Sequence, residues 1–307
     1  MMNEIKIFAP ATVANVSCGF DILGLCLDSV GDEMIIRKSE KKGVQITKIA
    51  GQDLPMEADK NVAGVAVMAL LDQLQSDAGF EIEIYKNIKP GSGIGSSAAS
   101  SAGAVFAVNE LLGKPFSGQE LVAFAMQGEK LASGTAHADN VAPALLGGFT
   151  MVTSYDPLNI IKIDAPEELY ATVIHPQIEV KTADSRSVLK QKASLKTLVT
   201  QMGHFGGLIA GLYTEDYELI GRSLQDEIIE PNRSILIPEF DNVKVSCEAN
   251  GALGSGISGS GPSIFALSRG EATAKKVAAG MAEVYEKIEI DFDIHISKVN
   301  PSGVKIL

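Results

Sequence analysis

The sequence predicts an α+β protein built from two domains, and two observations support this prediction. A chain of 307 residues with 46% hydrophobic residues is larger than one typical core and carries enough apolar material for two. Segments of alternating polarity are mixed with segments of helical spacing, and several strand candidates follow one another as hairpin-like pairs. A regular doubly wound sheet would instead alternate strand and helix throughout.

The first half of the chain should contain mostly strands before residue 50 and helices after residue 60. Polar and apolar residues alternate over residues 4–8, 33–38, 44–49 and 80–86. Apolar residues recur at helical spacing over residues 61–74, 97–112 and 119–131. Asn61 and Ser117 stand where the first and third helices need an N-cap, and Gly113 stands where the second should end.

The strand pattern returns after residue 148, and we place the domain junction there. Strands are expected over residues 149–153, 160–163, 170–174, 263–267 and 292–299. Helices are expected over residues 141–146, 183–189, 195–213, 217–224, 239–248 and 272–287. Asp156-Pro157 is a turn signal between the first two of these strands. We therefore predict one domain over residues 1–155 and a second over residues 156–307.

Composition and charge argue against several classes of protein. Apolar runs fall well short of the ~20 residues that cross a bilayer, and the N-terminus has no signal-peptide pattern, so we expect a cytoplasmic protein without a membrane partner. Cys18, Cys26 and Cys247 form no C-x-x-C pair, which argues against a zinc site or a disulfide framework. The net charge of -12 would repel phosphate backbones, so nucleic acid is not an expected partner.

The most informative segment is a glycine- and serine-rich loop that follows a predicted strand and opens a predicted helix. It consists of Pro90, Gly91, Ser92, Gly93, Ile94, Gly95, Ser96, Ser97, Ala98, Ala99 and Ser100. Glycines let the backbone turn its N–H groups toward one point, and the start of a helix adds positive potential. This geometry binds polyphosphate. The hydroxyls of Ser96 and Ser97 are suited to phosphate oxygens or to Mg²⁺.

Two common nucleotide-binding motifs do not describe this loop. The chain has no G-x-x-x-x-G-K-[ST] sequence, and Ser96 occupies the sixth position of G-x-G-x-x-G. A flexible turn before a tightly packed Ala/Ser helix is the alternative interpretation. Residues 254–259 do fit G-x-G-x-x-G, but they lead into a strand instead of a helix. The turn at residues 258–263 either closes over a phosphate or carboxylate or simply joins two chain segments.

Other polar residues are candidates for the same site, and each also has a structural explanation. Asp139 and Asn140 follow His137 and precede a predicted helix, so either one is suited to be its N-cap. The functional alternative is that this segment orients or deprotonates a hydroxyl. Glu129 ends an otherwise apolar helix and is either a solvated residue or a metal-binding carboxylate.

Two further pairs carry charge or hydrogen-bonding groups. Asn15 and Asp21 flank a polar loop that either holds an amine or hydroxyl or forms an Asx-turn. Arg186 and Arg233 are either bidentate partners for a carboxylate or phosphate, or ordinary surface residues.

Taken together and in this order, these segments resemble the GHMP kinase superfamily, and within it the homoserine kinases. The resemblance covers nearly the whole chain through five motifs, at residues 9–25, 90–103, 137–143, 230–233 and 256–263. The superfamily resemblance rests on the loop at residues 90–103 and on the glycine-rich turn at residues 256–263. The narrower resemblance rests on residues 137–140, on Thr182 with Arg186, and on residues 230–233.

This resemblance implies a fold and a reaction. The fold would combine an N-terminal domain similar to ribosomal protein S5 domain 2 with a C-terminal ferredoxin-like domain, and ATP would bind between them. The reaction would transfer a phosphoryl group from ATP to L-homoserine, giving O-phospho-L-homoserine, a step toward threonine. ATP, Mg²⁺ and L-homoserine are thus the expected ligands, and a homodimer is one option for the assembly.

The resemblance also assigns residues to these ligands. By position in the motifs, the substrate set is Asn15, Asp21, Glu129, His137, Asn140, Thr182, Arg186, Arg233 and Gly259. Asp21 suits the amino group of homoserine, whereas Arg186 and Arg233 suit its carboxylate. Residues 90–100 would bind ATP, and Ser97 with Glu129 would bind Mg²⁺.

The catalytic step admits two interpretations. Related kinases use an aspartate as base, and Asp139 aligns with it, whereas the resemblance to homoserine kinases implies positioning beside Asn140 without a clear base. Because phosphoryl transfer through a loose transition state needs little early deprotonation, we expect catalytic help from Asn140 and Arg186, with Glu129 holding the metal.

One local departure and two other functions accompany this prediction. The family's first motif usually has a glycine after its Asn-hydrophobic pair, and here Ser17 follows Asn15-Val16, so the shape of the substrate loop should differ. A GHMP kinase with a sugar or mevalonate-like acceptor is the nearest alternative. A non-catalytic sensor of ATP or an amino acid is the second.

Overall fold

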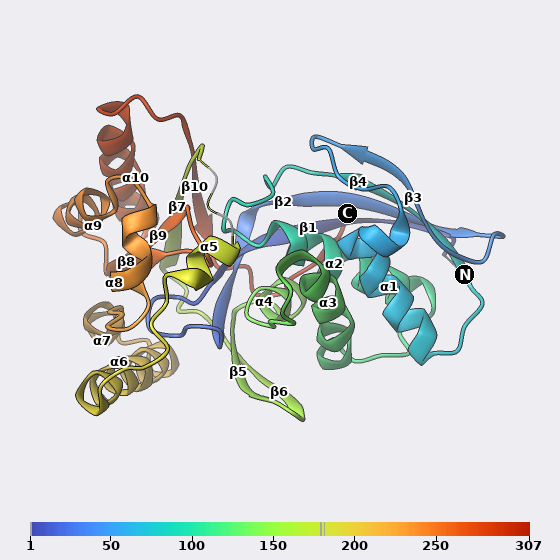
Figure 1. Ribbon diagram of the computed structural model, residues 1–307, viewed down its shortest axis with the longest axis horizontal. Coiled ribbons are helices and arrows are strands. Elements are labelled where there is room, and N and C mark those ends of the chain that lie inside the picture. Colours follow the sequence, from blue (N-terminus) through green and yellow to red (C-terminus); the bar gives the residue numbers. More distant parts are fainter. Residues whose placement is uncertain (1, 179, 181) are drawn as a thin grey trace.

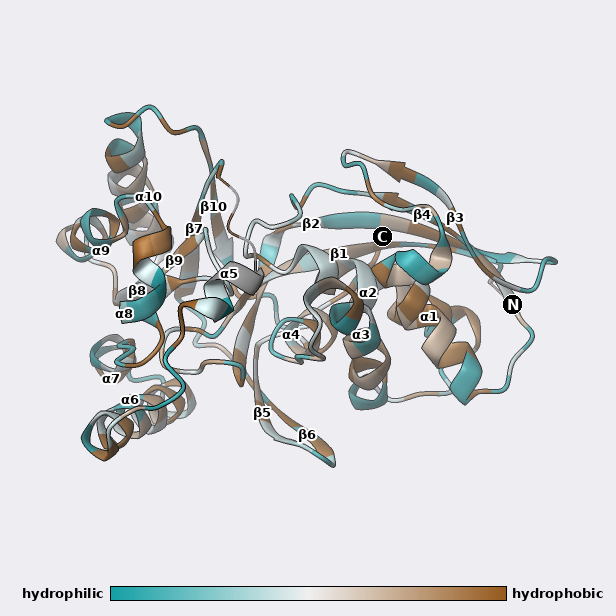
Figure 2. Cartoon of the chain, in the orientation of Figure 1, coloured by the Kyte–Doolittle hydropathy of each residue, from teal (hydrophilic) through white to brown (hydrophobic). Residues whose placement is uncertain are grey.

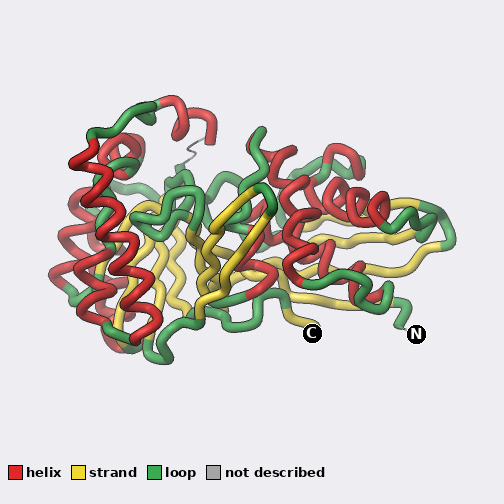
Figure 3. The backbone as a smooth tube through the Cα atoms, turned by 90° about the horizontal axis from the view of Figure 1, so that it is seen from below, coloured by secondary structure: helices red, strands yellow, loops and turns green. Residues whose placement is uncertain are grey.

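The computed structural model describes residues 2–178, 180 and 182–307, with the side chains of residues 182–184 excepted. The described chain forms two β-sheets with helices packed on each (Figure 1). Figure 3 shows the same arrangement from below, with the helices in two groups and strands running between them. The predicted α+β class is confirmed.

The first sheet is built mainly from the N-terminal part of the chain. Its strands are β1 (Glu4–Ala14), β2 (Leu23–Ser39), β3 (Gly43–Ala50), β4 (Gly79–Tyr85), β5 (Phe149–Tyr155), β6 (Leu158–Ile163) and β11 (Lys305–Ile306). They follow the order β11-β1-β2-β4-β3, with β5 paired to β2 and β6 paired to β5. The long strand β2 changes partner along its length, from β5 at residues 23–25 to β4 at residues 33–39.

Helices pack against this sheet, and the glycine loop leads from the interior strand β4 into one of them. They are η1 (Ala58–Lys60), α1 (Val62–Gln73), α2 (Ser96–Leu111), α3 (Gly118–Ser133) and α4 (Val141–Leu146). Asn61 accepts the N–H of Ala63, and Ser117 forms a capping box with Glu120, so both predicted caps are confirmed. A Cβ added to Gly103 would lie 2.9 Å from the Ala9 Cβ, which explains why α2 needs small side chains to approach β1.

The second sheet is antiparallel and belongs to the C-terminal part of the chain. Its strands are β7 (Leu169–Pro176), β8 (Gly254–Ile257), β9 (Ile264–Arg269) and β10 (Phe292–Lys298), in the order β10-β7-β9-β8. The helices of this region are α5 (Thr182–Ser187), α6 (Leu195–Thr214), α7 (Tyr217–Ser223), α8 (Glu230–Arg233), η2 (Ser234–Leu236), α9 (Phe240–Ala249) and α10 (Glu271–Glu286). Helix α10 packs on β7, β9 and β10, and α9 packs on β8.

The structure differs from the sequence prediction at several elements. Strands β1 and β2 are longer than predicted because both faces of their inner ends are buried, which removes the alternation. The short elements β8, β11 and α8 were not predicted. The change of sheet lies between Ile163 and Leu169, downstream of the boundary that we predict after residue 155. In the described part of the chain, no helix combines the length and apolarity needed to span a membrane.

Candidate active site

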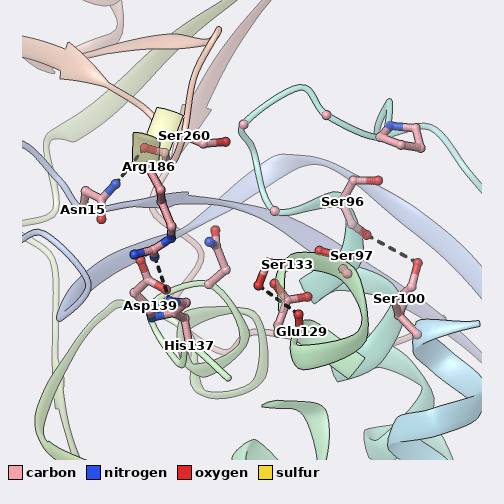
Figure 4. Close-up of a pocket in the computed structure, with 18 of the residues that line it drawn as sticks. Asn15, Ser96, Ser97, Ser100, Glu129, Ser133, His137, Asp139, Arg186 and Ser260 are labelled. Carbon is pink, nitrogen blue, oxygen red and sulfur yellow. Dashed lines mark hydrogen bonds between the residues drawn. The ribbon is translucent and has the colours of Figure 1, made fainter. Parts of the chain in front are cut away.

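A cavity of about 530 Å³ gathers residues from both parts of the chain (Figure 4). The predicted site residues that line it are Asn15, Asp21, Pro90, Gly91, Gly93, Gly95, Ser96, Ser97, Ser100, Glu129, His137, Asp139, Asn140, Arg186, Arg233 and Gly259. Ser92, Ile94, Ala98 and Ala99 do not line it, and their side chains pack into the surrounding protein instead. The Thr182 side chain lies outside the described residues, so its role stays a prediction.

The glycine loop bends sharply at one edge of this cavity, between β4 and α2. Gly91, Gly93 and Gly95 all have positive φ, at 74°, 82° and 72°, a conformation that other residues rarely adopt. The Ala99 N–H bonds to the Gly95 carbonyl at 2.9 Å, so α2 begins at this point. The N–H groups that start a helix have no intrahelical acceptor. Together these features put polar backbone and the positive end of α2 at the cavity wall.

The turn at residues 258–263, which follows β8 of the second sheet, holds this loop through two hydrogen bonds. Ser258 Oγ donates to the Gly93 carbonyl at 2.7 Å, and Ser263 Oγ donates to the Ser92 carbonyl at 2.6 Å. A Cβ on Gly93 would lie 2.7 Å from the carbonyl oxygen of Ser258. The turn at residues 258–263 therefore positions the loop, and the strand β8 just before it explains why the G-x-G-x-x-G match at residues 254–259 does not open a helix.

Asp32 and Lys86, which the sequence did not single out, form a buried ion pair that contacts the first turn of α2 beside the glycine loop. Lys86 Nζ forms an ion pair with Asp32 and donates to the Ser96 carbonyl at 2.9 Å and to Ser100 Oγ at 3.1 Å. Both side chains are almost completely buried. Burial lowers the pKa of Lys86, against the opposing effect of Asp32. A lysine ending the alternating segment just before the glycine loop was the available signal.

A charged cluster forms another wall of the cavity. Arg186 donates to Asp21 Oδ1 at 3.0 Å and to His137 Nε2 at 2.7 Å. Burial lowers the pKa of His137, which fits an unprotonated Nε2 that can accept from Arg186. Asn15 holds this wall in place, because its Oδ1 accepts the Asp21 N–H at 2.9 Å and its Nδ2 donates to the Gly259 carbonyl at 2.7 Å. An ordinary Asx-turn is therefore not its role.

Arg233 lies beside this cluster and is 3% exposed, so it is not a surface arginine. Its Nε donates to the Ser185 carbonyl at 3.0 Å, and one terminal nitrogen donates to the Gly259 carbonyl at 3.2 Å. Burial lowers its pKa to about 10, so the side chain is still a cation at neutral pH.

Asn140 occupies the N-cap position of α4, yet its side chain makes no cap hydrogen bond. Instead Thr12 Oγ1 donates to Asn140 Oδ1 at 2.7 Å. Because this bond occupies the carbonyl oxygen, the amide nitrogen is available to the cavity. Asp139 is buried, and its Oδ1 has no hydrogen-bond partner among the described residues. Burial, then the negative charges of Asp21 and Glu129, raise its pKa to about 7.

Glu129 is also buried at the cavity wall, which rules out the solvated alternative. Its Oε1 lacks a hydrogen-bond partner within the described chain. Burial raises its pKa to about 7, opposed by a hydrogen bond from Ser97 and by the charge of Lys86. A carboxylate with an unsatisfied buried oxygen beside a hydroxyl is a suitable partial ligand set for a hard cation.

Comparison with known proteins places both halves of the chain in one family. Residues 61–148 match the GHMP kinases N terminal domain, and residues 208–287 match the GHMP kinases C terminal domain. A homoserine kinase of Chlorobium phaeobacteroides (strain BS1) is 46% identical over 320 residues, covering 100% of both chains. The chain belongs to the homoserine kinase family of GHMP kinases. The sequence resemblance is thereby confirmed, and kinases of this type use ATP.

Solved structures agree with this membership of the homoserine kinase family. The crystal structure of a homoserine kinase from Cytophaga hutchinsonii ATCC 33406 is similar at a TM-score of 0.96 and 51% identity, covering 100% of this chain and 98% of that chain. L. major mevalonate kinase in complex with R-mevalonate reaches a TM-score of 0.71 at 18% identity, covering 96% of each chain, which shows a shared fold alone. The predicted two-domain GHMP kinase fold is confirmed.

Proposed function

We propose that this member of the homoserine kinase family uses ATP and Mg²⁺ to phosphorylate L-homoserine in the cytoplasm. The observation that carries the proposal is that one cavity joins the glycine loop at the start of α2 to Asp21, Arg186 and Arg233. The loop suits a polyphosphate, and the charged wall suits a small zwitterion. The shared name of the full-length relatives supports the same substrate.

In this proposal the nucleotide lies along the glycine loop. The phosphates contact backbone N–H groups of residues 91–97, where the start of α2 adds positive potential. Leu54, Val62 and Ala132 give the cavity an apolar region, which suits a nucleobase. The Asp32–Lys86 pair fixes the first turn of α2 through the Ser96 carbonyl and so maintains the cradle.

Glu129 and Ser97 are the residues that would hold Mg²⁺. The described residues contain no group of three or more His, Cys, Asp and Glu side chains placed to hold a metal. Mg²⁺ fits this site nonetheless, because it commonly takes one or two carboxylates together with substrate phosphates and water. When bound, it would supply charge neutralisation at the phosphate oxygens. Glu129 supplies the carboxylate, and its Oε1 has no hydrogen-bond partner among the described residues.

The acceptor is oriented by charge. Asp21 binds the amino group of homoserine, Arg233 and Arg186 bind its carboxylate, and the hydroxyl then points toward the phosphates. The hydroxyl oxygen forms a bond to the terminal phosphorus as the bond to the ADP oxygen breaks, and the hydroxyl proton leaves late to a phosphate oxygen. The Asn140 amide, held by Thr12, and the Arg186 guanidinium stabilise the charge on the transferred group.

Asp139→Asn separates positioning from general-base catalysis. We expect the variant to keep kcat within about tenfold of the parent, whereas loss of a general base costs about 10²- to 10⁴-fold. A base with a pKa of about 7 would also make kcat of the parent fall as pH drops below 7, because its protonated form cannot accept a proton. We expect the two pH profiles to run parallel. Near-complete loss of kcat with an unchanged melting temperature would instead establish Asp139 as the base.

ADP release with a panel of acceptors tests the function itself. We expect ATP turnover with L-homoserine and none above background with mevalonate or galactose, because neither of these pairs an ammonium with a carboxylate. Turnover with one of the other acceptors would make the chain a different GHMP kinase. Thermal stabilisation by ATP and L-homoserine without ADP release would identify a sensor.

A further inference from the structure

Phe20 contacts both arginines of the cavity wall, and the function proposed above gives it no role. The guanidinium carbon of Arg233 lies 5.0 Å from the centre of the Phe20 ring, and that of Arg186 lies 5.8 Å from it. A guanidinium within about 6 Å of an aromatic ring centre is attracted by the negative face of the ring. The arginines come from two short helices, α5 and α8, and Figure 2 shows hydrophilic residues of α8 in teal. One apolar ring therefore contacts cations from two separate elements.

The two arginines lie close enough to repel each other. After burial, the charge of Arg186 is the next cause of the lowered pKa of Arg233. Arg186 pairs with Asp21 at 3.0 Å, whereas Arg233 donates to two carbonyl groups and forms no salt bridge with a described residue. The Nε of Arg186 is buried and has no hydrogen-bond partner in the described part of the chain. A ring face shared by both guanidinium groups offsets part of this repulsion.

The substrate loop holds the backbone of Phe20 on both sides. The Gly19 carbonyl accepts the N–H groups of Ile22 at 3.1 Å and Leu23 at 2.9 Å, and a Cβ on Gly19 would lie 2.4 Å from the Leu23 Cβ. On the other side, the Asp21 N–H donates to Asn15 Oδ1. The Phe20 side chain itself is half-buried. The loop therefore presents the ring to the arginines from a fixed turn.

We propose that Phe20 is a positioning residue that holds the guanidinium groups of Arg186 and Arg233 together as one binding site for the substrate carboxylate. Phe20 acts through the arginines, since it does not itself line the cavity. The proposal rests on the proposed function, because it takes L-homoserine as the acceptor. Without the ring the two cations move apart, which weakens binding of a carboxylate that needs both and leaves the phosphate cradle unchanged.

The first test changes the charge on the ring face and little else. Phenylalanine analogues with one, two or three ring fluorine atoms, incorporated at position 20 of the full chain, keep the ring while fluorine withdraws electron density from its face. We expect KM for L-homoserine to rise with each fluorine, by about tenfold with three, and KM for ATP to stay within about twofold of the parent value. A KM for L-homoserine that stays constant or falls along the series would overturn the proposal.

The second test removes the ring. We expect Phe20→Leu to raise KM for L-homoserine about tenfold and to keep kcat within about threefold, because Asp21 and His137 still hold Arg186. Phe116→Leu is the matched control, since Phe116 is also half-buried and its ring centre lies 4.8 Å from that of Phe124. The control should keep the parent KM. An equal rise in both variants would identify a general loss of packing and overturn the role of Phe20.

Failure of the proposed function has a different signature. A parent that does not turn over L-homoserine contradicts the function, and the fluorinated series is then measured by melting temperature without substrate. This measurement is informative because the contacts of the ring with both arginines involve no ligand. A melting temperature that falls with each fluorine would retain Phe20 as the residue that holds the two arginines. An unchanged melting temperature would overturn that role.

Discussion

Gly95→Ala should lower kcat/KM for ATP by about 100-fold or more, equivalent to about 3 kcal/mol of transition-state stabilisation. Gly95 has a φ of 72°, and an added Cβ would lie 2.1 Å from Thr12 Oγ1 and 3.0 Å from Asn140 Oδ1. The methyl group therefore forces the start of α2 away from β1 and disturbs the Thr12–Asn140 hydrogen bond. Steady-state kinetics with ATP varied at saturating L-homoserine measures the loss.

Gly91→Ala is the matched control for this prediction. Gly91 has a φ of 74°, nearly the same as Gly95, but an added Cβ would meet no described atom within 4 Å. Backbone strain alone costs about 1–2 kcal/mol, so we expect a smaller loss than for Gly95→Ala. If the two variants lose the same activity, the close contact with Thr12 has no part in forming the phosphate cradle.

Arg186→Met should lower kcat/KM for L-homoserine by about 10³-fold, equivalent to about 4 kcal/mol of transition-state stabilisation, because it removes a half-buried cation from the cavity wall. The change removes the cation proposed for the substrate carboxylate and the transferred phosphoryl group. It also leaves Asp21 without its 3.0 Å partner and His137 without a donor at Nε2. Kinetics with L-homoserine varied at saturating ATP measures the effect, and the Kd for ATP measured without acceptor should change little.

Arg222→Met controls for the loss of one positive charge. Arg222 lies on α7 with a side chain that is 64% exposed, and its partner Glu218 is 3.8 Å away, so the parent activity should persist. Arg186→Lys adds a second comparison, because it keeps the charge but loses the planar fork and should recover only part of the activity. A parent-like KM for L-homoserine in Arg186→Met would show that the carboxylate binds elsewhere.

Much of the fold was predictable because local patterns report local burial. Caps such as Asn61 and Ser117 act on N–H groups two or three residues away, so their effect is visible in the sequence. Strands β1 and β2 were predicted too short because their inner ends are buried on both faces, where alternation disappears. β8 has glycines at two of its four positions, and it pairs only because β9 supplies the partner.

The sequence by itself determined the chemistry available: a glycine loop at a helix start, and carboxylates, amides and arginines in motifs shared with one kinase family. Only the tertiary structure decided how these groups act on one another. Folding buries the carboxyl group of Asp139. It also pairs Arg186 with Asp21, which lies far from it along the chain. The same is true of the Asp32–Lys86 pair. The physical reason is that burial and charge pairing depend on what surrounds a side chain after folding, and residue order records only which side chains are present.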